Sequence, residues 1–153
     1  MILLYALLLG VVSGLRTMLA PAAVSWAARL GFLSLAGTPL AFMGYRYTPI
    51  ILTVLAIGEL ITDKLPMTPS RKVPMQFCAR ILSGSLVGAT IGAANQMLLA
   101  GLFAGAIGAV AGTLGGAAFR GKLAAALGKD LPAALIEDVI AILLAVFTVA
   151  RFR

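Results

Sequence analysis

Long apolar runs constrain the fold of this 153-residue chain more than any other feature. Five of them are close to the ~20 mainly apolar residues that a helix needs to cross a membrane. Only 11% of the residues are charged, whereas about a quarter of the residues of a soluble domain are. So few charges cannot cover a soluble surface, and we predict an all-α, polytopic transmembrane helical bundle. The expected spans are 2–20, 48–65, 73–94, 97–116 and 131–150.

The net charge of +7 comes mostly from basic residues between the apolar runs, where membrane proteins keep cytoplasmic Lys and Arg. No basic stripe with interleaved aromatic residues exists. We therefore expect a multi-pass protein of the inner (plasma) membrane, whose partner is the lipid bilayer and not nucleic acid. Counting basic residues on the two sides gives six against four and favours a cytoplasmic N-terminus. The six are Lys64, Arg71, Lys72, Arg120, Lys122 and Lys129, and the four are Arg29, Arg46, Arg151 and Arg153.

Two spans continue beyond a membrane thickness and are expected to break. Pro21 removes a backbone donor and marks a break near 16–20, and the pair Gly115-Gly116 marks a second one by its flexibility. The continuations at 20–33 and 117–128 would then be amphipathic helices at the membrane interface.

A repeat organises the expected single domain, 1–153. "GVVSGLRT" followed by "LITD" resembles "GAVAGTLG" followed by "LIED", which makes about 1–66 repeat 1 and about 97–153 repeat 2, with a linker helix at about 73–95. Two spans separate the glycine-rich ones, so the repeats would have inverted topology, a common transporter plan. The alternative is chance similarity between Gly/Ala/Leu-rich helices.

Acidic residues inside the apolar runs are the candidates for function. Glu59 lies near the middle of the second span, and Asp63 follows one turn later on the same face. Intramembrane charges need partners and mark ion paths or binding sites. We predict a water-reachable substrate- or ion-binding cluster; the alternatives are a structural salt-bridge lattice or acids at the interface. The predicted site residues are Arg16, Thr17, Glu59, Asp63, Arg80, Glu137 and Asp138.

Glycines recur every three or four residues in two of the spans, at 84–92 and 101–116. Small residues at that spacing let helix backbones approach closely. Tight packing within the chain is the favoured interpretation and a dimer face is the alternative. Because five short helices make a thin bundle, we expect a homo-oligomer, with a dimer favoured.

Enzyme chemistry has little support in the sequence. The chain has no His and only Cys78, which excludes a zinc constellation of the usual kind and an intrachain disulfide. No nucleophile elbow, phosphate-binding loop or dinucleotide turn is present. We predict no cofactor, no metal and no enzymatic activity. A lipid-acting intramembrane enzyme with paired carboxylates remains a less favoured alternative.

These motifs together resemble a bacterial domain-of-unknown-function family of small integral membrane proteins, and the resemblance covers nearly the whole chain. One departure is Phe119-Arg120, where the family pattern suggests a His before the Lys, which weakens metal binding or a His proton relay. The family implies the fold and the choice of residues but no substrate. The matching residues are Arg16 and Thr17, Glu59, Asp63, Lys64 and Pro66, Arg80, Lys122, and Glu137 and Asp138.

A small-solute or ion transporter or channel, coupled to protons or cations, is the function that these patterns favour. Four deep acids against two deep arginines leave a formal charge of −2, which favours a cation or protons as the species bound. The alternative is a non-transport membrane scaffold or assembly protein, in which the same charges only hold the helices together.

Overall fold

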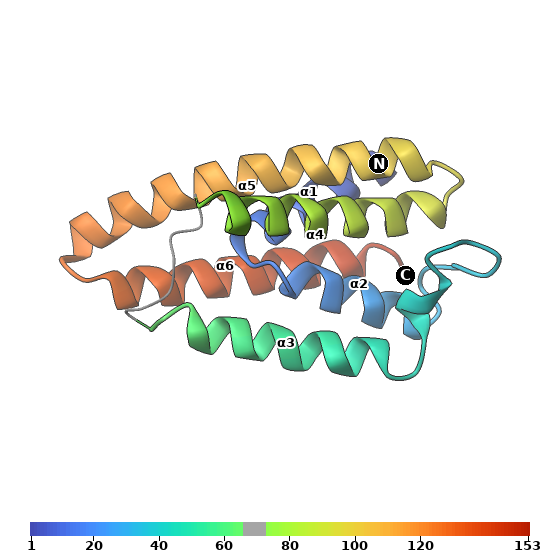
Figure 1. The fold of residues 1–153 in the computed structure, drawn as a ribbon, viewed down its shortest axis with the longest axis horizontal. Helices are drawn as coiled ribbons and strands as arrows, with labels where there is room; N and C mark the ends of the chain where they lie inside the picture. The colour runs from blue at the N-terminus through green and yellow to red at the C-terminus, as the bar shows by residue number, and fades with distance from the viewer. Residues whose placement is uncertain (66–72) are drawn as a thin grey trace.

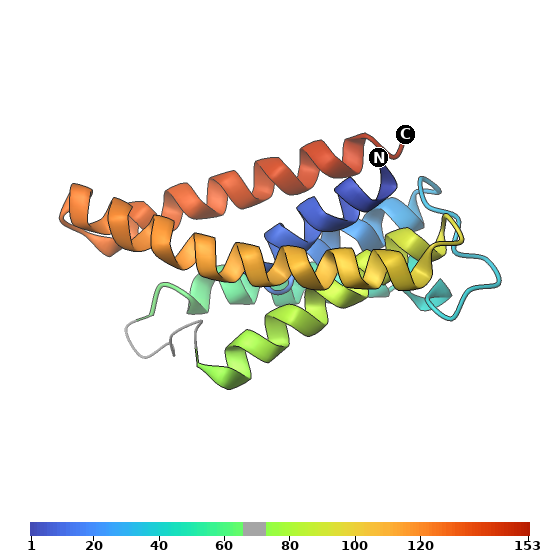
Figure 2. The same cartoon turned by 90° about the horizontal axis from the view of Figure 1, so that it is seen from above.

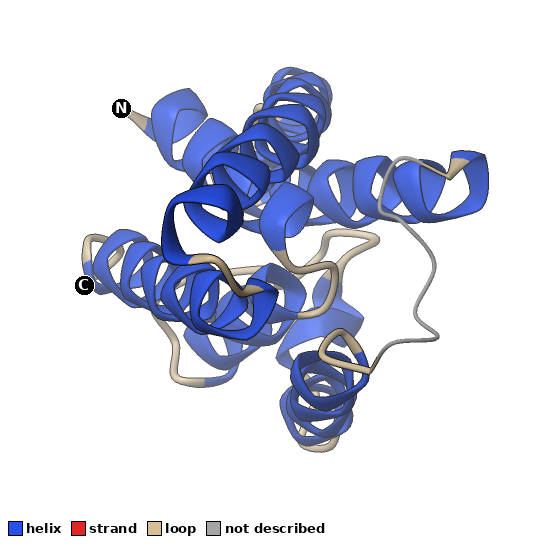
Figure 3. Ribbon diagram, turned by 90° about the vertical axis from the view of Figure 1, so that its left-hand side faces the viewer, coloured by secondary structure: helices blue, strands red, loops and turns tan. Residues whose placement is uncertain are grey.

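Helices make up the described structure of this chain. A computed structural model describes residues 1–65 and 73–153, and within those ranges it has six α-helices, one short 3-10 helix and no strand (Figure 1). Viewed from one end, most of the α-helices are seen nearly along their axes, and α4 is inclined to them (Figure 3). They are α1 Ile2–Leu15, α2 Leu19–Arg29, η1 Ala41–Gly44, α3 Thr48–Thr62, α4 Pro74–Ala93, α5 Leu98–Leu127 and α6 Asp130–Ala150.

The all-α class is confirmed, and three expected spans correspond to α3, α4 and α6. Pro49 and Pro74 occupy the first turns of α3 and α4. The N–H groups of a first turn have no partner within the helix, so proline costs no helical hydrogen bond there. The boundary between the expected spans 73–94 and 97–116 is a tight turn, because Gln96 has a positive φ of 58° and α5 begins two residues later. Proline, turn residues and apolar length were sufficient to locate these helices.

The first apolar run, by contrast, does not cross the bundle. α1 ends at Leu15 after 14 residues, so the run 2–20 does not form one helix. The chain then reverses, and α2 runs back towards the end where α1 began (Figure 2). We call α1 and α2 the re-entrant hairpin and residues 16–18 its tip. The expected span 2–20 is therefore wrong.

Contacts at the termini establish the direction of this hairpin. The Tyr5 ring, near the start of α1, packs edge-on against Phe152 with 5.7 Å between ring centres. The Arg153 guanidinium lies 5.0 Å from the centre of the Phe32 ring, just beyond α2. The start of α1, the end of α2 and the C-terminus therefore meet at one end of the molecule (Figures 1 and 2).

The break itself falls where it was expected, between Leu15 and Leu19, but for a different reason. Arg16 has extended backbone angles, φ −140° and ψ 116°. Pro21 lies in the first turn of α2, where its ring fits a starting helix, so it begins α2 and does not break α1. The expected interfacial helix at 20–33 is instead α2, whose Ala20, Val24 and Ala27 are fully buried.

The reversal also changes which basic residues share an end with the N-terminus. The N-terminus lies with the ends of α2 and α6 and the start of α3, far from the turn between α5 and α6 (Figure 1). The expectation that it shares a side with Lys64 and Lys129 is wrong. Arg71 and Lys72 lie outside the described residues, and without them the count of basic residues is four against four.

α5 is one continuous helix of 30 residues, so the break expected at Gly115-Gly116 is wrong. The segment 117–128, expected to be an interfacial helix, is the last part of α5. It ends at Gly128, which adopts a left-handed φ of 71° that suits a helix terminus. The turn at residues 128–129 leads directly into α6.

Four glycines of α5 serve packing within the chain, as favoured from the sequence: Gly101, Gly105, Gly108 and Gly112. A Cβ added at Gly105 or Gly101 would overlap the backbone of α4 at Gly84 and Gly88, and one added at Gly112 would overlap α1. Only glycine allows backbones to approach this closely. α5 thus packs directly against both α4 and α1.

The same contacts contradict the inverted repeat. Gly10 faces Gly105, and Gly14 faces the backbone of Ala109 and Thr113. Residue numbers therefore increase in the same direction along both helices, and α1 and α5 are parallel. The acid-bearing helices α3 and α6 run in opposite directions (Figure 1). No single rotation relates one proposed repeat to the other.

Apolar side chains cover much of the outer surface. α5 and α6 are long and apolar enough to cross a membrane. Only 33% and 39% of the residues in their most apolar stretches are buried, which is consistent with membrane association. The apolar faces of α3, α5 and α6 point away from the bundle, whereas Ser13, Arg16 and Thr113 are fully buried. More than half exposed are Ile51, Val54, Ile61, Leu99, Phe103, Ile107, Val139, Leu143 and Val146.

Candidate functional site

Charged side chains converge on the tip of the re-entrant hairpin. Every acidic residue of the chain takes part, and among the described residues four bases contact them. We call this set the charged cluster. Its members are Arg16, Glu59, Asp63, Lys64, Arg80, Arg120, Asp130, Glu137 and Asp138. All the charged residues predicted for the site belong to it, and Thr17 lies at the tip.

Arg16 connects the hairpin to the two acid-bearing helices. It is fully buried because the break turns its side chain into the bundle. One guanidinium nitrogen lies 2.5 Å from Asp63 Oδ2, at the end of α3, and the other pairs with Asp138 of α6. The second carboxylate oxygen of Asp138 accepts from Lys64 Nζ at 2.5 Å. Asp63 and Glu59 are similarly buried, with 14% and 18% of their side chains exposed.

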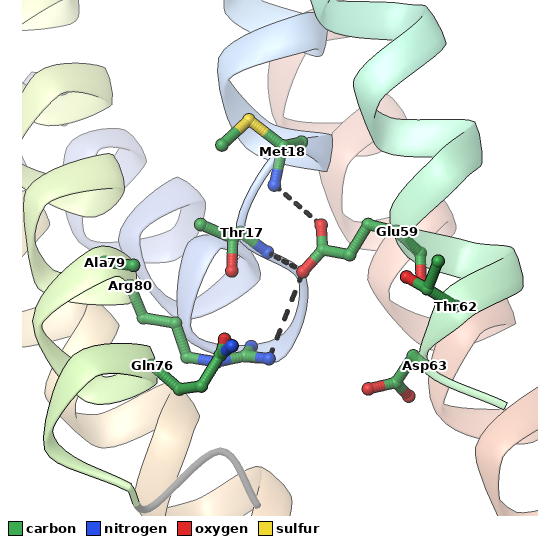
Figure 4. A pocket seen from close by; sticks show the side chains of 8 residues that line it. All are labelled: Thr17, Met18, Glu59, Thr62, Asp63, Gln76, Ala79 and Arg80. Atoms are coloured by element: carbon green, nitrogen blue, oxygen red, sulfur yellow. Dashed lines mark hydrogen bonds and ion pairs between the residues drawn. The ribbon is translucent and has the colours of Figure 1, made fainter. Parts of the chain in front are cut away.

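Glu59 holds the backbone of the tip itself. Its carboxylate accepts from the backbone N–H groups of Thr17 at 2.7 Å and Met18 at 2.8 Å (Figure 4). These donors precede α2, and a helix N-terminus favours a negative charge because its N–H groups lack helical partners. One carboxylate thus replaces the hydrogen bonds that the break in the helix removes.

Arg80 donates a hydrogen bond to the backbone on the α1 side of the break. Its Nη1 donates to the carbonyl oxygen of Gly14 at 2.7 Å, and its Nη2 lies 4.0 Å from Glu59 Oε1. Ser83 Oγ donates to the carbonyl oxygen of Thr17. The end of α1 therefore has a cationic partner from α4 and the start of α2 an anionic partner from α3, in agreement with the helix dipole.

A polar pocket of about 290 Å³ opens beside the tip, between α3 and α4 (Figure 4). Glu59 and Asp63 line it from α3, and Arg80 from α4, so both acids lie on one side, as their spacing predicted. We call it the tip pocket. Its lining residues are Thr17, Met18, Glu59, Thr62, Asp63, Gln76, Ala79 and Arg80.

Arg120 is the most important residue that the sequence analysis missed. Its Nη1 lies 2.8 Å from Asp63 Oδ2 and 3.9 Å from Glu137 Oε2, and it also bonds Asp130 at 2.6 and 3.0 Å. It was assigned to an interfacial segment because α5 was expected to break before it. Since α5 continues, Arg120 stays beside the bundle and reaches the ends of α3 and α6.

The additional bases change the charge expected for the site. Lys64 and Arg120 join Arg16 and Arg80, while Asp130 joins the four predicted acids. Five acids against four bases give a formal charge of −1 for the charged cluster, in place of −2. The acids lie close to their partners, so the cluster is both a candidate binding site and a strong structural element.

Metal binding finds no support in the described ranges, where no group of three or more His, Cys, Asp or Glu residues could hold a metal ion. Cys78 is exposed and free of disulfide bonding. The interactions that the described residues of this site make are ion pairs and hydrogen bonds to backbone groups.

Comparison with known proteins adds one finding. The family model described as "Domain of unknown function (DUF4126)" matches residues 3–151. The chain belongs to this family. No curated protein and no solved structure matches the chain. The family covers nearly the whole bundle, including every member of the charged cluster, and its description carries no activity.

Proposed function

We propose that this protein is a multi-pass membrane transporter or channel for a small solute or ion, with the tip pocket as its binding site. The re-entrant hairpin is the observation that carries the proposal. A helix that enters a bundle, stops and returns exposes backbone donors and acceptors deep inside. In membrane proteins such irregular backbone is tolerated where it is enclosed in protein or lines a water-filled cavity, and it forms many transport sites.

A membrane environment is supported by the distribution of side chains. Apolar residues dominate the outside of α3, α5 and α6, while the charged cluster lies within the bundle. Exposed apolar surface on this scale marks contact with lipid or with another protein. α3 and α4 would cross together with α5 and α6, and the hairpin would enter from one side only.

Glu59 is the residue that we propose couples binding to a conformational change. As a carboxylate it holds the N–H groups of Thr17 and Met18 in charge-assisted hydrogen bonds, which are stronger than neutral ones. A proton or cation arriving in the tip pocket would neutralise that charge and weaken the hold on the tip. The hairpin could then shift while Arg16 keeps it attached to Asp63 and Asp138.

Flux through proteoliposomes tests the proposal. The probes are protons, followed with an entrapped pH dye under a potassium diffusion potential, and ²²Na⁺ as a cation. We expect native protein to conduct at least one of them and Glu59→Gln to lose most of that flux. Asp130→Asn is the matched control, since Asp130 lies at the exposed edge of the cluster. Equal flux for native protein and Glu59→Gln would end the proposal.

A structural role is the second candidate, favoured by one observation. Each acid of the cluster contacts a base, and the pairs join α1, α3, α4, α5 and α6. A membrane scaffold or assembly protein would use such a lattice to fix its helices. It predicts that Glu59→Gln lowers thermal stability and oligomer yield while neither the native protein nor the variant conducts any ion.

Location and assembly complete the proposal. We place the protein in the inner (plasma) membrane as a homodimer, since the bundle is thin and its outer apolar faces are available for association. The link between α3 and α4 carries Arg71 and Lys72 in its sequence, and positive residues favour the cytoplasmic side. Both termini would then face away from the cytoplasm, opposite to the sequence-based expectation for the N-terminus.

A further inference from the structure

The tip pocket opens sideways, between α3 and α4. α3 packs against α2 and η1, and across residues 48–62 and 74–93 it has no substantial packing contact with α4. Both helices line the pocket, and the tip of the re-entrant hairpin lies between them (Figure 4). The entrance of the pocket therefore faces the same surroundings as the outer faces of these two helices.

Exposed apolar side chains border this entrance. On α4, Met75 and Leu82 lie one turn on either side of Ala79, which lines the pocket. On α3, Leu55 lies one turn before Glu59. The exposed fractions of Met75, Leu82 and Leu55 are 79%, 71% and 49%. A ligand that enters between α3 and α4 thus passes an apolar border before it reaches the polar lining.

Two uncharged polar groups of the lining have no hydrogen-bond partner among the described residues, the Thr17 hydroxyl and the Gln76 amide. The backbone of Thr17 is engaged on both sides, by Glu59 and Ser83, which leaves only its hydroxyl available. Thr17 is only 8% exposed, yet its hydroxyl oxygen is not sealed inside the protein. Its side chain lies between those from α4 and those from α3 (Figure 4). A hydroxyl and an amide can each donate and accept a hydrogen bond.

The charged lining residues, by contrast, already have partners. Glu59 accepts from the backbone of the tip, and Arg80 donates to the backbone at the end of α1. Asp63 contacts both Arg16 and Arg120. A charged ligand group would have to compete with these pairs. An uncharged group can instead bond to the hydroxyl and the amide and leave the charged cluster intact.

We propose that the tip pocket binds an uncharged amphiphile, whose head group both donates and accepts hydrogen bonds, as a carboxamide or an alcohol does. The head would bond to Thr17 and Gln76, and the apolar chain would extend past Met75 and Leu82 into the lipid. This assignment rests on the proposed function, because α3 and α4 border lipid only if they cross the membrane. It adds the chemical class of the solute and its route, which starts from the bilayer, and it leaves Glu59 to take up the coupling proton.

Photolabelling of full-length protein in lipid nanodiscs tests the assignment. The probe is dodecanamide with a photoreactive diazirine in its chain, and mass spectrometry of the digested protein locates the labelled residues. We expect labels on the apolar border, at Met75, Leu82 or Leu55. The N,N-dimethyl amide of the same chain cannot donate a hydrogen bond, and it should label these positions about fivefold less, as the loss of one hydrogen bond predicts.

Four variants place the head group. Ala79→Leu should prevent labelling, because it fills the pocket without removing a polar group. Cys78→Leu is the matched control, since Cys78 is the exposed neighbour of Ala79 and does not line the pocket; it should label as native protein does. Thr17→Val keeps the side-chain shape and the backbone hydrogen bonds of the tip, and it should lower labelling by dodecanamide about fivefold. Gln76→Met removes the amide from a partly exposed position and keeps the test decisive if Thr17→Val does not fold.

Three outcomes would overturn the proposal. Equal labelling by the two amides, or undiminished labelling of Ala79→Leu, would mean that only the chain is bound, as any acyl chain is. Stronger labelling by the carboxylate or ammonium analogue of the same chain would assign the pocket to charged head groups. Competition by acetamide as effective as that by unlabelled dodecanamide would mean that the solute comes from water.

The flux assay separates this proposal from the proposed function. Ion flux that is lost in Glu59→Gln, without any labelling by dodecanamide, would keep the proposed function and end the amphiphile assignment. Labelling of the expected kind in a protein that conducts no ion would keep the amphiphile site and end the proposed ion coupling.

Discussion

α1 and α5 look alike in sequence and end differently in space. Both are rich in glycine and they run in the same direction in direct contact; an arginine follows α1 at position 16, and one lies within α5 at position 120. α1 stops at Leu15 and the chain reverses, whereas α5 passes its glycine pair and continues to Leu127. Both routes bring an arginine to Asp63. Arg16 reaches it because the chain breaks after α1, and Arg120 reaches it because α5 does not break.

The difference between α1 and α5 shows what ends a buried helix. At the tip, the groups released by the break have partners, because Glu59 accepts from Thr17 and Met18 and Arg80 donates to Gly14. Unpaired backbone groups inside a bundle cost several kcal/mol each, of the order of 2 or more. The glycine pair of α5 releases no such groups because the helix satisfies its own. Side-chain partners supplied by other helices decide where the chain reverses.

The largest effect is expected from a test of whether α1 crosses the membrane. A re-entrant hairpin followed by four crossings puts both termini on one side, whereas five crossings put them on opposite sides. We expect epitope tags at the two ends to become accessible to protease together, in either right-side-out or inverted vesicles but not both. Accessibility of one tag alone in each preparation would mean that α1 spans the membrane.

Arg16 and Arg120 should differ sharply when each is neutralised. Arg16→Gln leaves Asp63 and Asp138 each short of one buried partner, so we expect a loss of about 3 kcal/mol in the free energy of unfolding. Arg120 is partly exposed and Asp63 keeps Arg16, so Arg120→Gln should lose only about 1 kcal/mol. Chemical unfolding in mixed micelles measures both. Similar losses would mean that the break has no special role in holding the cluster.

Close packing between α5 and its neighbours should be sensitive to volume. Gly105→Val would force side-chain atoms onto the backbone of α4, and we expect a loss of about 1–3 kcal/mol or a failure to fold. Gly121→Val is the control, because its Cβ would meet no atom within 4 Å. The same unfolding assay applies. A dimer face in place of the contact within the chain would instead show as a change in oligomeric state with little loss of monomer stability.

The smallest effect concerns the glycine pair itself. If α5 is continuous, Gly115→Ala should stabilise it by up to about 1 kcal/mol, because alanine is the better helix former and nothing obstructs its Cβ. A hinge at this position would respond in the opposite way, since alanine would resist bending. Thermal unfolding of the two proteins, with helix content followed by circular dichroism, distinguishes these results.

Several features were predictable from local patterns. Apolar length and flanking proline placed α3 and α4, and the charge on α6 was read from "LIED". Arg16 and Arg80 were identified as partners of the acids because buried charges need opposite charges. The predicted inverted repeat is wrong because the relative direction of α1 and α5 was not predictable in this way, since equal patterns in the two helices are compatible with either direction.

The sequence by itself determined that the chain forms apolar helices and that its few charges must meet one another, because apolar side chains offer acids no other partners. The tertiary structure alone decided that α1 returns on itself, that α5 continues and that Arg120 joins the cluster. Those outcomes depend on which distant side chain reaches a released backbone group. Glu59 lies 42 residues from Thr17 along the chain, and no local pattern encodes such a contact.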